Sequence, residues 1–97
     1  MRPQKLEASS IQSEVARLAG WALREDGKAI LKTFKFKNFV EAFGFMTQCA
    51  LAAEKLDHHP EWFNVYATVD VTLSTHDADG LTELDFRLAG LMDKTAG

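Results

Sequence analysis

The chain of 97 residues has a single cysteine and no long apolar run. Cys49 cannot form a disulfide within the chain, and in its apolar stretch it is expected to be a small buried residue rather than a nucleophile. No segment has the ~20 consecutive apolar residues that span a bilayer, and the residues after Met1 lack the apolar core of a signal peptide. We therefore expect no membrane contact. We also expect the protein to lie in a reducing compartment, the cytoplasm or the nucleus.

An excess of positive charge is absent too, since 11 Lys and Arg face 14 Asp and Glu, for a formal net charge of -3. Nonspecific nucleic-acid binding needs Lys and Arg to neutralise phosphates, so no direct nucleic-acid contact is expected. Apolar residues are plentiful at 46% of the chain, which is enough for a packed core. Without repeats, linkers or low-complexity segments, residues 1–97 are predicted to form one domain.

The first half of the chain predicts a helix followed by a hairpin. Residues 11–19 follow the spacing of one helix face, with Ser9 or Ser10 as the cap and Gly20 as the end. Residues 21–24 and 29–37 are predicted to be strands joined by an Asp-Gly turn. In the second strand the even positions are apolar, with the exception of a lysine at position 32, so one face of the sheet is expected to be buried.

A long helix is predicted from Phe39 to about Leu56, introduced by Asn38 and Glu41 at the spacing of a capping box. It has two apolar stripes, one of Phe39, Phe43, Met46, Ala50 and Ala53, the other of Phe45, Cys49, Ala52 and Leu56. Because this is more apolar surface than one sheet covers, we expect part of the helix to pack against another subunit.

From residue 63 to residue 74 apolar and polar side chains alternate strictly, which predicts a strand. Twelve residues would span about 40 Å at ~3.3 Å each, longer than a small sheet offers. We expect a bend near Ala67 that gives two collinear strands, or an overhang that pairs with a neighbour. A polar loop then leads to a last helix, capped by Thr82 and Asp85.

The three histidines lie at the two ends of this alternating run. His58 and His59 precede it, next to Pro60, which ends helical geometry, and His76 follows it. Histidine titrates near ~6.5 and both gives and takes protons at neutral pH, so histidines beside carboxylates predict an acid-base site. We interpret the two junctions as two walls of one pocket. A structural role for each histidine at its helix end stays open.

Neighbouring residues could tune or complete this pocket. Glu54, four residues before His58 on about the same helical face, and the adjacent Asp57 are expected to orient an imidazole. Trp62 is either an aromatic wall for a flat ligand or a core residue. Asp85 is fully explained as a capping residue.

Other kinds of site fit the sequence less well. Adjacent histidines lack the i, i+4 spacing of two metal ligands on one helix face, so no metal is expected. Ser74 and Thr75 lie near His76 without a nucleophile elbow. No phosphate-binding or dinucleotide fingerprint is present, so no such cofactor is expected.

The sequence His58-His59-Pro60, with Thr75-His76 after the strand, resembles the pterin-4a-carbinolamine dehydratases. The resemblance rests on residues 53–66, 73–77 and 80–82 with Asp85, and it covers nearly the whole chain from about residue 11. It implies an α+β fold of two layers, with three helices on one face of a four-stranded antiparallel sheet, assembled as a homodimer or homotetramer.

The implied activity is that of a hydro-lyase without metal or organic cofactor. It removes water from 4a-hydroxytetrahydropterin to give quinonoid dihydropterin, in the recycling of tetrahydrobiopterin for aromatic amino-acid hydroxylases. The resemblance implies catalysis by His58, His59 and His76. The substrate-binding residues that it implies are Glu54, Asp57, Thr75, Asp77, Ala78 and Asp85. We add Pro60, which fixes the turn, and Trp62, as an aromatic wall, to this set.

Within this set we assign His58 and His76 to proton transfer and His59 to positioning. Some family members also act as dimerisation cofactors of a homeodomain transcription factor, through the helical surface that builds the tetramer. A protein-binding coactivator role is therefore the alternative function, and a structural interaction module with histidine caps is the third.

Overall fold

The computed structural model describes residues 3–97, which form three α-helices and one four-stranded sheet. The elements follow in the order α1 (Ala8–Arg17), β1 (Ala22–Leu23), β2 (Ile30–Lys35), α2 (Phe39–Leu56), β3 (Glu61–Val65), β4 (Thr68–Leu73), the short 3-10 helix η1 (His76–Ala78) and α3 (Glu83–Ala96). All strand pairs are antiparallel, in the order β1-β2-β4-β3. The predicted α+β class is confirmed.

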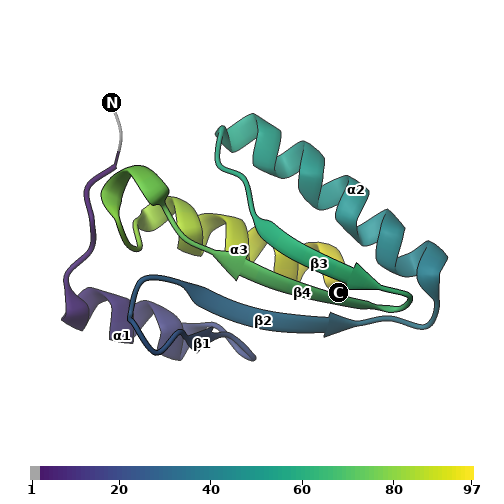
Figure 1. Ribbon diagram of the computed structural model, residues 1–97, viewed down its shortest axis with the longest axis horizontal. Coiled ribbons are helices and arrows are strands. Elements are labelled where there is room, and N and C mark those ends of the chain that lie inside the picture. Colours follow the sequence, from purple (N-terminus) through teal and green to yellow (C-terminus); the bar gives the residue numbers. More distant parts are fainter. Residues whose placement is uncertain (1–2) are drawn as a thin grey trace.

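The helices cover one face of the sheet, and the core lies between the two layers (Figure 1). On β2 the side chains of Ile30 and Phe34 are buried, whereas Thr33 and Lys35 are exposed, as the alternation predicts. In Figure 1, α3 runs behind the sheet, α2 along the side of β3, and α1 along the side of β1 and β2. The buried side chains that the helices contribute include Ile11, Phe45, Cys49, Leu88 and Met92.

The long alternating run folds back on itself, so the expectation of two collinear strands is wrong. β3 and β4 form an antiparallel hairpin in which Val65 pairs with Thr68. The chain reverses through Tyr66 and Ala67, and Tyr66 takes the left-handed backbone conformation with φ 51°. The turn needs no glycine or Asn-Gly signal, which is why the sequence pattern did not reveal it.

The hairpin also changes which side chains of β3 face the core. A two-residue turn pairs odd positions of one strand with even positions of the other, as in the pair Trp62 and Val71. The odd residues of β4 are buried, so the odd residues of β3 face outward. Phe63 and Val65 are therefore 64% and 58% exposed, although the unbroken alternation predicted that they share a face with Val69.

Helix starts agree with prediction in two of three cases. The Asn38 side chain accepts the N–H of Glu41 at 2.9 Å and begins α2, although the Glu41 carboxylate accepts the N–H of Lys37 instead of completing the box. Thr82 begins α3 in a complete capping box. The prediction for α1 is wrong, because the helix begins at Ala8 and no side chain caps it, which leaves Ser9 and Ser10 inside the first turn.

The long α2 helix buries only part of its apolar surface within this chain. Phe45 and Cys49 of one predicted stripe are buried, and Ala53 of the other is buried with them. Phe39 and Phe43 remain exposed, as do Val40 and Leu51 on the same helix. A row of apolar side chains on α2 thus faces away from the core.

The lysine that interrupts the alternation of β2 anchors three segments to one another. Lys32 Nζ lies 2.7 Å from Asp93 Oδ1 of α3 and 3.0 Å from the carbonyl of Ala19. Asp93 also accepts the indole N–H of Trp21, and the ammonium group lies 4.7 Å from the Phe34 ring centroid. A positive charge is therefore stable on the inward face because a carboxylate, a carbonyl and an aromatic face surround it.

Replacing Lys32 with methionine should lower the free energy of unfolding by about 1–2 kcal/mol, because the Asp93 carboxylate loses its charged donor. Chemical denaturation with urea measures this change. Lys35→Met, on the exposed face of the same strand, is the control and should leave the unfolding midpoint in place. Equal midpoints for the two variants would contradict the anchoring role of Lys32.

Candidate active site

The end of α2 sends its two histidines to opposite sides. Asp57 takes the left-handed conformation, with φ 51° and ψ 42°, and its N–H binds the carbonyls of Ala53 and Glu54. The N–H of His58 binds the carbonyl of Ala53 at 3.0 Å. This left-handed C-cap reverses the chain, so that the His58 side chain points into the protein and the His59 side chain toward solvent.

His58 forms a short bond to a carboxylate in the protein interior. Its Nε2 lies 2.6 Å from Oδ1 of Asp85, and the two residues are 7% and 0% exposed. Asp85 is the third residue of α3, so this contact joins the end of one helix to the start of another. A buried carboxylate needs donors around it, and an imidazole N–H is one such donor.

The other oxygen of Asp85 is bound as well. Its Oδ2 accepts the hydroxyl of Thr75 at 2.8 Å and the backbone N–H of Thr82 at 3.0 Å. The two threonine hydroxyls lie 2.8 Å from each other. The capping box of α3 therefore holds the carboxylate that contacts His58.

The other two histidines have carboxylate partners at the surface. His59 Nε2 lies 2.7 Å from Glu54 Oε1, and His76 Nε2 lies 3.6 Å from Glu61 Oε2. The side chains of His59 and His76 are 56% and 76% exposed. Each histidine thus faces one carboxylate, but only the pair of His58 is shielded from water.

The loop that carries His76 is closed at its base. Thr75 and Gly80 form an antiparallel bridge in which each backbone N–H binds the other's carbonyl, at 2.8 and 3.3 Å. Asp79 ends η1 in the left-handed conformation, and its carboxylate contacts Lys28 of the first hairpin at 3.2 Å. These contacts tie the loop to the sheet.

The two histidine junctions meet around one cavity. Its volume is about 230 Å³, and its lining residues are Asp57, His58, His59, Ser74, Thr75, His76 and Asp77. The structure therefore brings together the histidines from the end of α2 and the histidine after β4, as the sequence predicted. Such a volume suits a small ligand rather than a polymer.

Several predicted site residues do not line this cavity. Glu54 reaches His59 at the surface rather than His58, although its spacing pointed to His58. Trp62 packs against the core from β3, and Pro60 and Ala78 are half-buried beside the cavity. Asp85 lies behind His58 and Thr75, two residues that line the cavity, and contacts both of them.

The structure adds residues that sequence reasoning did not assign. Ser74 lines the cavity, Glu61 faces His76, and Thr82 supports Asp85. The only sequence signal for Thr82 was its capping-box spacing, which predicted the helix start and not a contact to a histidine. Glu61 gave no signal, because its distance to His76 depends on how β3 and the loop after β4 meet.

Nucleophilic chemistry at Cys49 does not fit the structure. The side chain is buried between α2 and the core, and burial raises the pKa of its thiol to about 11. Within residues 3–97, no three His, Cys, Asp or Glu side chains are grouped to hold a metal ion. In the same residues, no helix is both long enough and apolar enough to cross a membrane.

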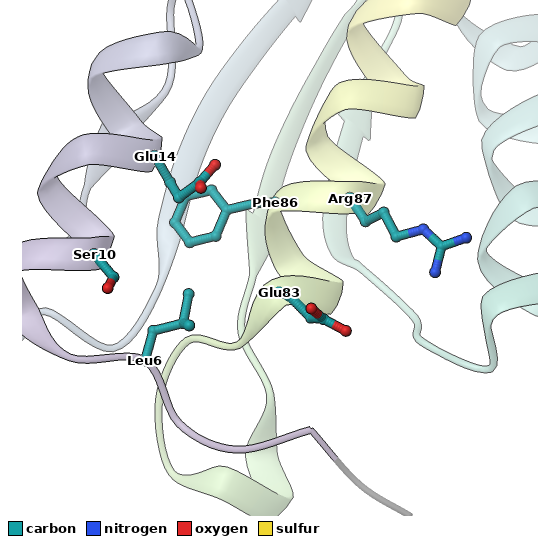
Figure 2. Close-up of a pocket in the computed structure, with 6 residues that line it drawn as sticks. All are labelled: Leu6, Ser10, Glu14, Glu83, Phe86 and Arg87. Atoms are coloured by element: carbon teal, nitrogen blue, oxygen red, sulfur yellow. The ribbon is translucent and has the colours of Figure 1, made fainter.

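A larger cavity of about 520 Å³ lies between α1 and α3, away from the histidines (Figure 2). Leu6 and the Phe86 ring face the gap, while Arg87 extends away from Phe86 on α3. Glu14 and Glu83 contribute carboxylates to its lining. None of the residues predicted to form the site belongs to this cavity.

Comparison with known proteins points to one family. Residues 4–95 match the family model described as "Pterin 4 alpha carbinolamine dehydratase". The chain is 69% identical over 96 residues to a Sinorhizobium fredii protein named "Putative pterin-4-alpha-carbinolamine dehydratase", covering 99% of this chain and 91% of that protein. A Rhizobium meliloti protein of the same name is also 69% identical, with 99% and 92% covered.

Solved structures agree with this match. The crystal structure of a transcriptional coactivator/pterin dehydratase from Brucella melitensis superposes with a TM-score of 0.94 at 52% identity, over 97% of this chain and 100% of that chain. A pterin dehydratase-like RuBisCO assembly factor of the alpha-carboxysome has a TM-score of 0.70 at 22% identity, over 80% and 90%. The second likeness shows the shared fold alone.

The Asp85 contact predicts one protonation form for the neutral His58 ring. Nε2 should carry the hydrogen and donate it to Asp85, which leaves Nδ1 as an acceptor. Nitrogen-15 NMR of the histidine rings distinguishes the two forms, and the Nε2 hydrogen of His58 should exchange slowly with water. The exposed rings of His59 and His76 are the internal control, because their hydrogens should exchange fast. A His58 ring protonated only at Nδ1 would contradict the assignment.

Proposed function

We propose, because the chain belongs to the pterin-4a-carbinolamine dehydratase family, that it removes water from a 4a-hydroxytetrahydropterin at the cavity of His58, His59 and His76. The observation that carries this proposal is the meeting of three imidazoles from two distant parts of the chain around one small cavity. The product is a quinonoid dihydropterin. Reduction of that product would return tetrahydrobiopterin to an aromatic amino-acid hydroxylase.

The dehydration needs one acid and one base. The C4a–O bond breaks, and the hydroxyl takes a proton and leaves as water. N5 loses its proton, and the electron pair of that N–H bond forms the new double bond between C4a and N5. Because the sum is loss of water without a change in oxidation level, the step calls for proton transfer and not for an electron acceptor.

His58 suits the role of the base. Since Asp85 holds the hydrogen on Nε2, Nδ1 is the nitrogen left to accept the N5 proton. The imidazolium that forms would lie 2.6 Å from the Asp85 carboxylate in a buried position, where an opposite charge stabilises it strongly. This arrangement supports the assignment of His58 to proton transfer.

His76 suits the role of the acid. Its side chain is 76% exposed, so it can regain a proton from water after each turnover. His59 remains the positioning residue, held by Glu54 at the mouth of the cavity. Asp57 and Asp77 line the cavity and offer carboxylates to the N–H groups along the edge of a pterin.

The remaining residues of the predicted set support the site in this proposal, Thr75 from the cavity wall and the others from behind it. Pro60 fixes the turn after the histidine pair, and Trp62 anchors β3 to the core. Asp85 acts through His58, and Thr75 has its hydroxyl bound to Asp85. Ala78 ends η1, two residues after His76.

A second proposal concerns assembly through the exposed face of α2. The apolar row of Phe39, Phe43 and Leu51 continues into a groove of about 580 Å³ between α2 and α3. Apolar surface of this kind marks an interaction site. We propose that it pairs with other copies of the chain to form a homodimer or homotetramer, and binding of a transcription factor there is the alternative. The name of the Brucella melitensis relative, a transcriptional coactivator/pterin dehydratase, supports that alternative.

Replacing His58 or His76 with alanine should lower the turnover number for dehydration roughly 10²–10⁴-fold, because a proton donor or acceptor is lost. His59→Ala should mainly raise KM. The assay follows loss of a 4a-hydroxytetrahydropterin by absorbance, with circular dichroism to show that each variant is folded. Gln12→Ala, on exposed α1, is the control. Near wild-type turnover in all three folded histidine variants would remove the cavity from consideration.

Leu51→Glu should lower the oligomer mass measured by sedimentation equilibrium, since it places a charge in the exposed row of α2. Leu23→Glu, an exposed leucine on the edge strand β1, is the matched control and should leave the mass unchanged. A wild-type protein that stays monomeric at all concentrations would contradict assembly through α2.

A further inference from the structure

The hydroxyl hydrogens around Asp85 can be assigned by counting donors. Thr75 Oγ1 lies 2.8 Å from Asp85 Oδ2 and 2.8 Å from Thr82 Oγ1, and it has one hydrogen. A carboxylate only accepts, so Thr75 donates to Asp85. Thr82 must then donate to Thr75, and its own oxygen accepts the N–H of Leu84 at 3.3 Å. The hydrogen bonds run in one direction, from Thr82 through Thr75 to Asp85.

The two carboxylate oxygens of Asp85 have different partners. Oδ2 accepts from the Thr75 hydroxyl and from the Thr82 N–H, and Oδ1 contacts His58. Thr75, Thr82 and Asp85 are buried, at 3%, 0% and 0% exposure. With water largely excluded, a rotation of the carboxylate would leave buried donors without acceptors, which is costly.

We propose that Thr75 and Thr82 are positioning residues of the dehydration, which hold Asp85 so that His58 keeps its hydrogen on Nε2 and presents Nδ1 as the base. This inference rests on the proposed role of His58. The capping box of α3 then has two tasks, because the Asp85 carboxylate and the Thr82 N–H start a helix and also orient an imidazole. Neither threonine needs to touch the substrate through its hydroxyl.

Loss of the Thr75 hydroxyl separates the two tasks. Valine has nearly the same shape as threonine, but it removes one donor from Asp85 Oδ2 and the acceptor of the Thr82 hydroxyl. Asp85 Oδ2 then keeps only the Thr82 N–H, so the carboxylate turns more readily and the His58 ring spends part of its time with the hydrogen on Nδ1, a form in which Nδ1 cannot act as the base. The loss should appear in kcat rather than in KM, since valine keeps the shape of the cavity lining at position 75 and the other lining residues are unchanged.

The test compares Thr75→Val and Thr82→Val with the conservative variants Thr75→Ser and Thr82→Ser. Thr75→Val should lower kcat roughly 10–100-fold, with KM changed by less than about threefold and the base limb of the pH profile displaced. Thr82→Val should have a smaller effect, because the Thr82 hydroxyl reaches Asp85 only through Thr75, and the Thr75 hydroxyl and the Thr82 N–H still bind Oδ2. The serine variants keep the hydroxyl and should recover most of the wild-type kcat.

The matched control is Thr33→Val. Thr33 also donates its hydroxyl to an aspartate, Asp70 at 2.7 Å, but on the exposed face of the sheet. The Thr33→Val variant should leave kcat, the pH profile and the His58 ring spectrum unchanged. A thermal unfolding curve for every variant separates loss of the helix cap from loss of positioning.

Two readouts keep this inference apart from the proposed function. Nitrogen-15 NMR of the His58 ring needs no substrate, and it should show an increased Nδ1-protonated population in Thr75→Val. Wild-type kcat and a wild-type ring spectrum in both valine variants would overturn the positioning role, even if His58→Ala is inactive. Full activity of His58→Ala would instead overturn the proposed role of His58 as the base. Should Thr75→Val fail to fold, Thr82→Val decides the question by the same two readouts.

Discussion

The site depends on the hydrogen bond between His58 Nε2 and Asp85 Oδ1. It links the residue after the C-cap of α2 to the first turn of α3, two helices that also pack against each other under the sheet. A carboxylate without solvent is stable only where donors surround it, and Asp85 has an imidazole, a hydroxyl and a backbone N–H. The helix start, the buried charge and the orientation of His58 are therefore one arrangement.

The three histidines differ because the backbone gives them different surroundings. The left-handed Asp57 turns His58 inward and His59 outward, and the bridge between Thr75 and Gly80 holds His76 at the opposite wall. The imidazole of His58 is thus shielded from water and held in place, whereas the imidazoles of His59 and His76 are exposed to water. The dehydration that we propose moves two protons on a small rigid substrate, and this contrast suits it because one nitrogen would be pre-set as the base and another would regain its proton from water.

Local patterns predicted most of the elements, and the main wrong prediction, for β3 and β4, has one physical cause. The alternation of β2 identified its buried face, and the Asn38 and Thr82 signals identified two helix starts. The same alternation failed across β3 and β4, because a two-residue turn at Tyr66 exchanges the faces while leaving the sequence pattern unbroken. Phe63 and Val65 therefore lie outside, although each local step of the pattern is correct. Periodicity describes a strand and does not report where the chain reverses.

The sequence by itself determined the class of the fold, the histidines at the strand ends and the family resemblance, because these depend on residue type and spacing along the chain. Only the tertiary structure decided the pairings across it: Asp85 with His58, Glu54 with His59, and Glu61 with His76. Asp85 had a complete local explanation as a helix cap, and its second role depends on a residue 27 positions away. Spacing can bring residues of one helix together, whereas contacts between elements depend on how their faces pack.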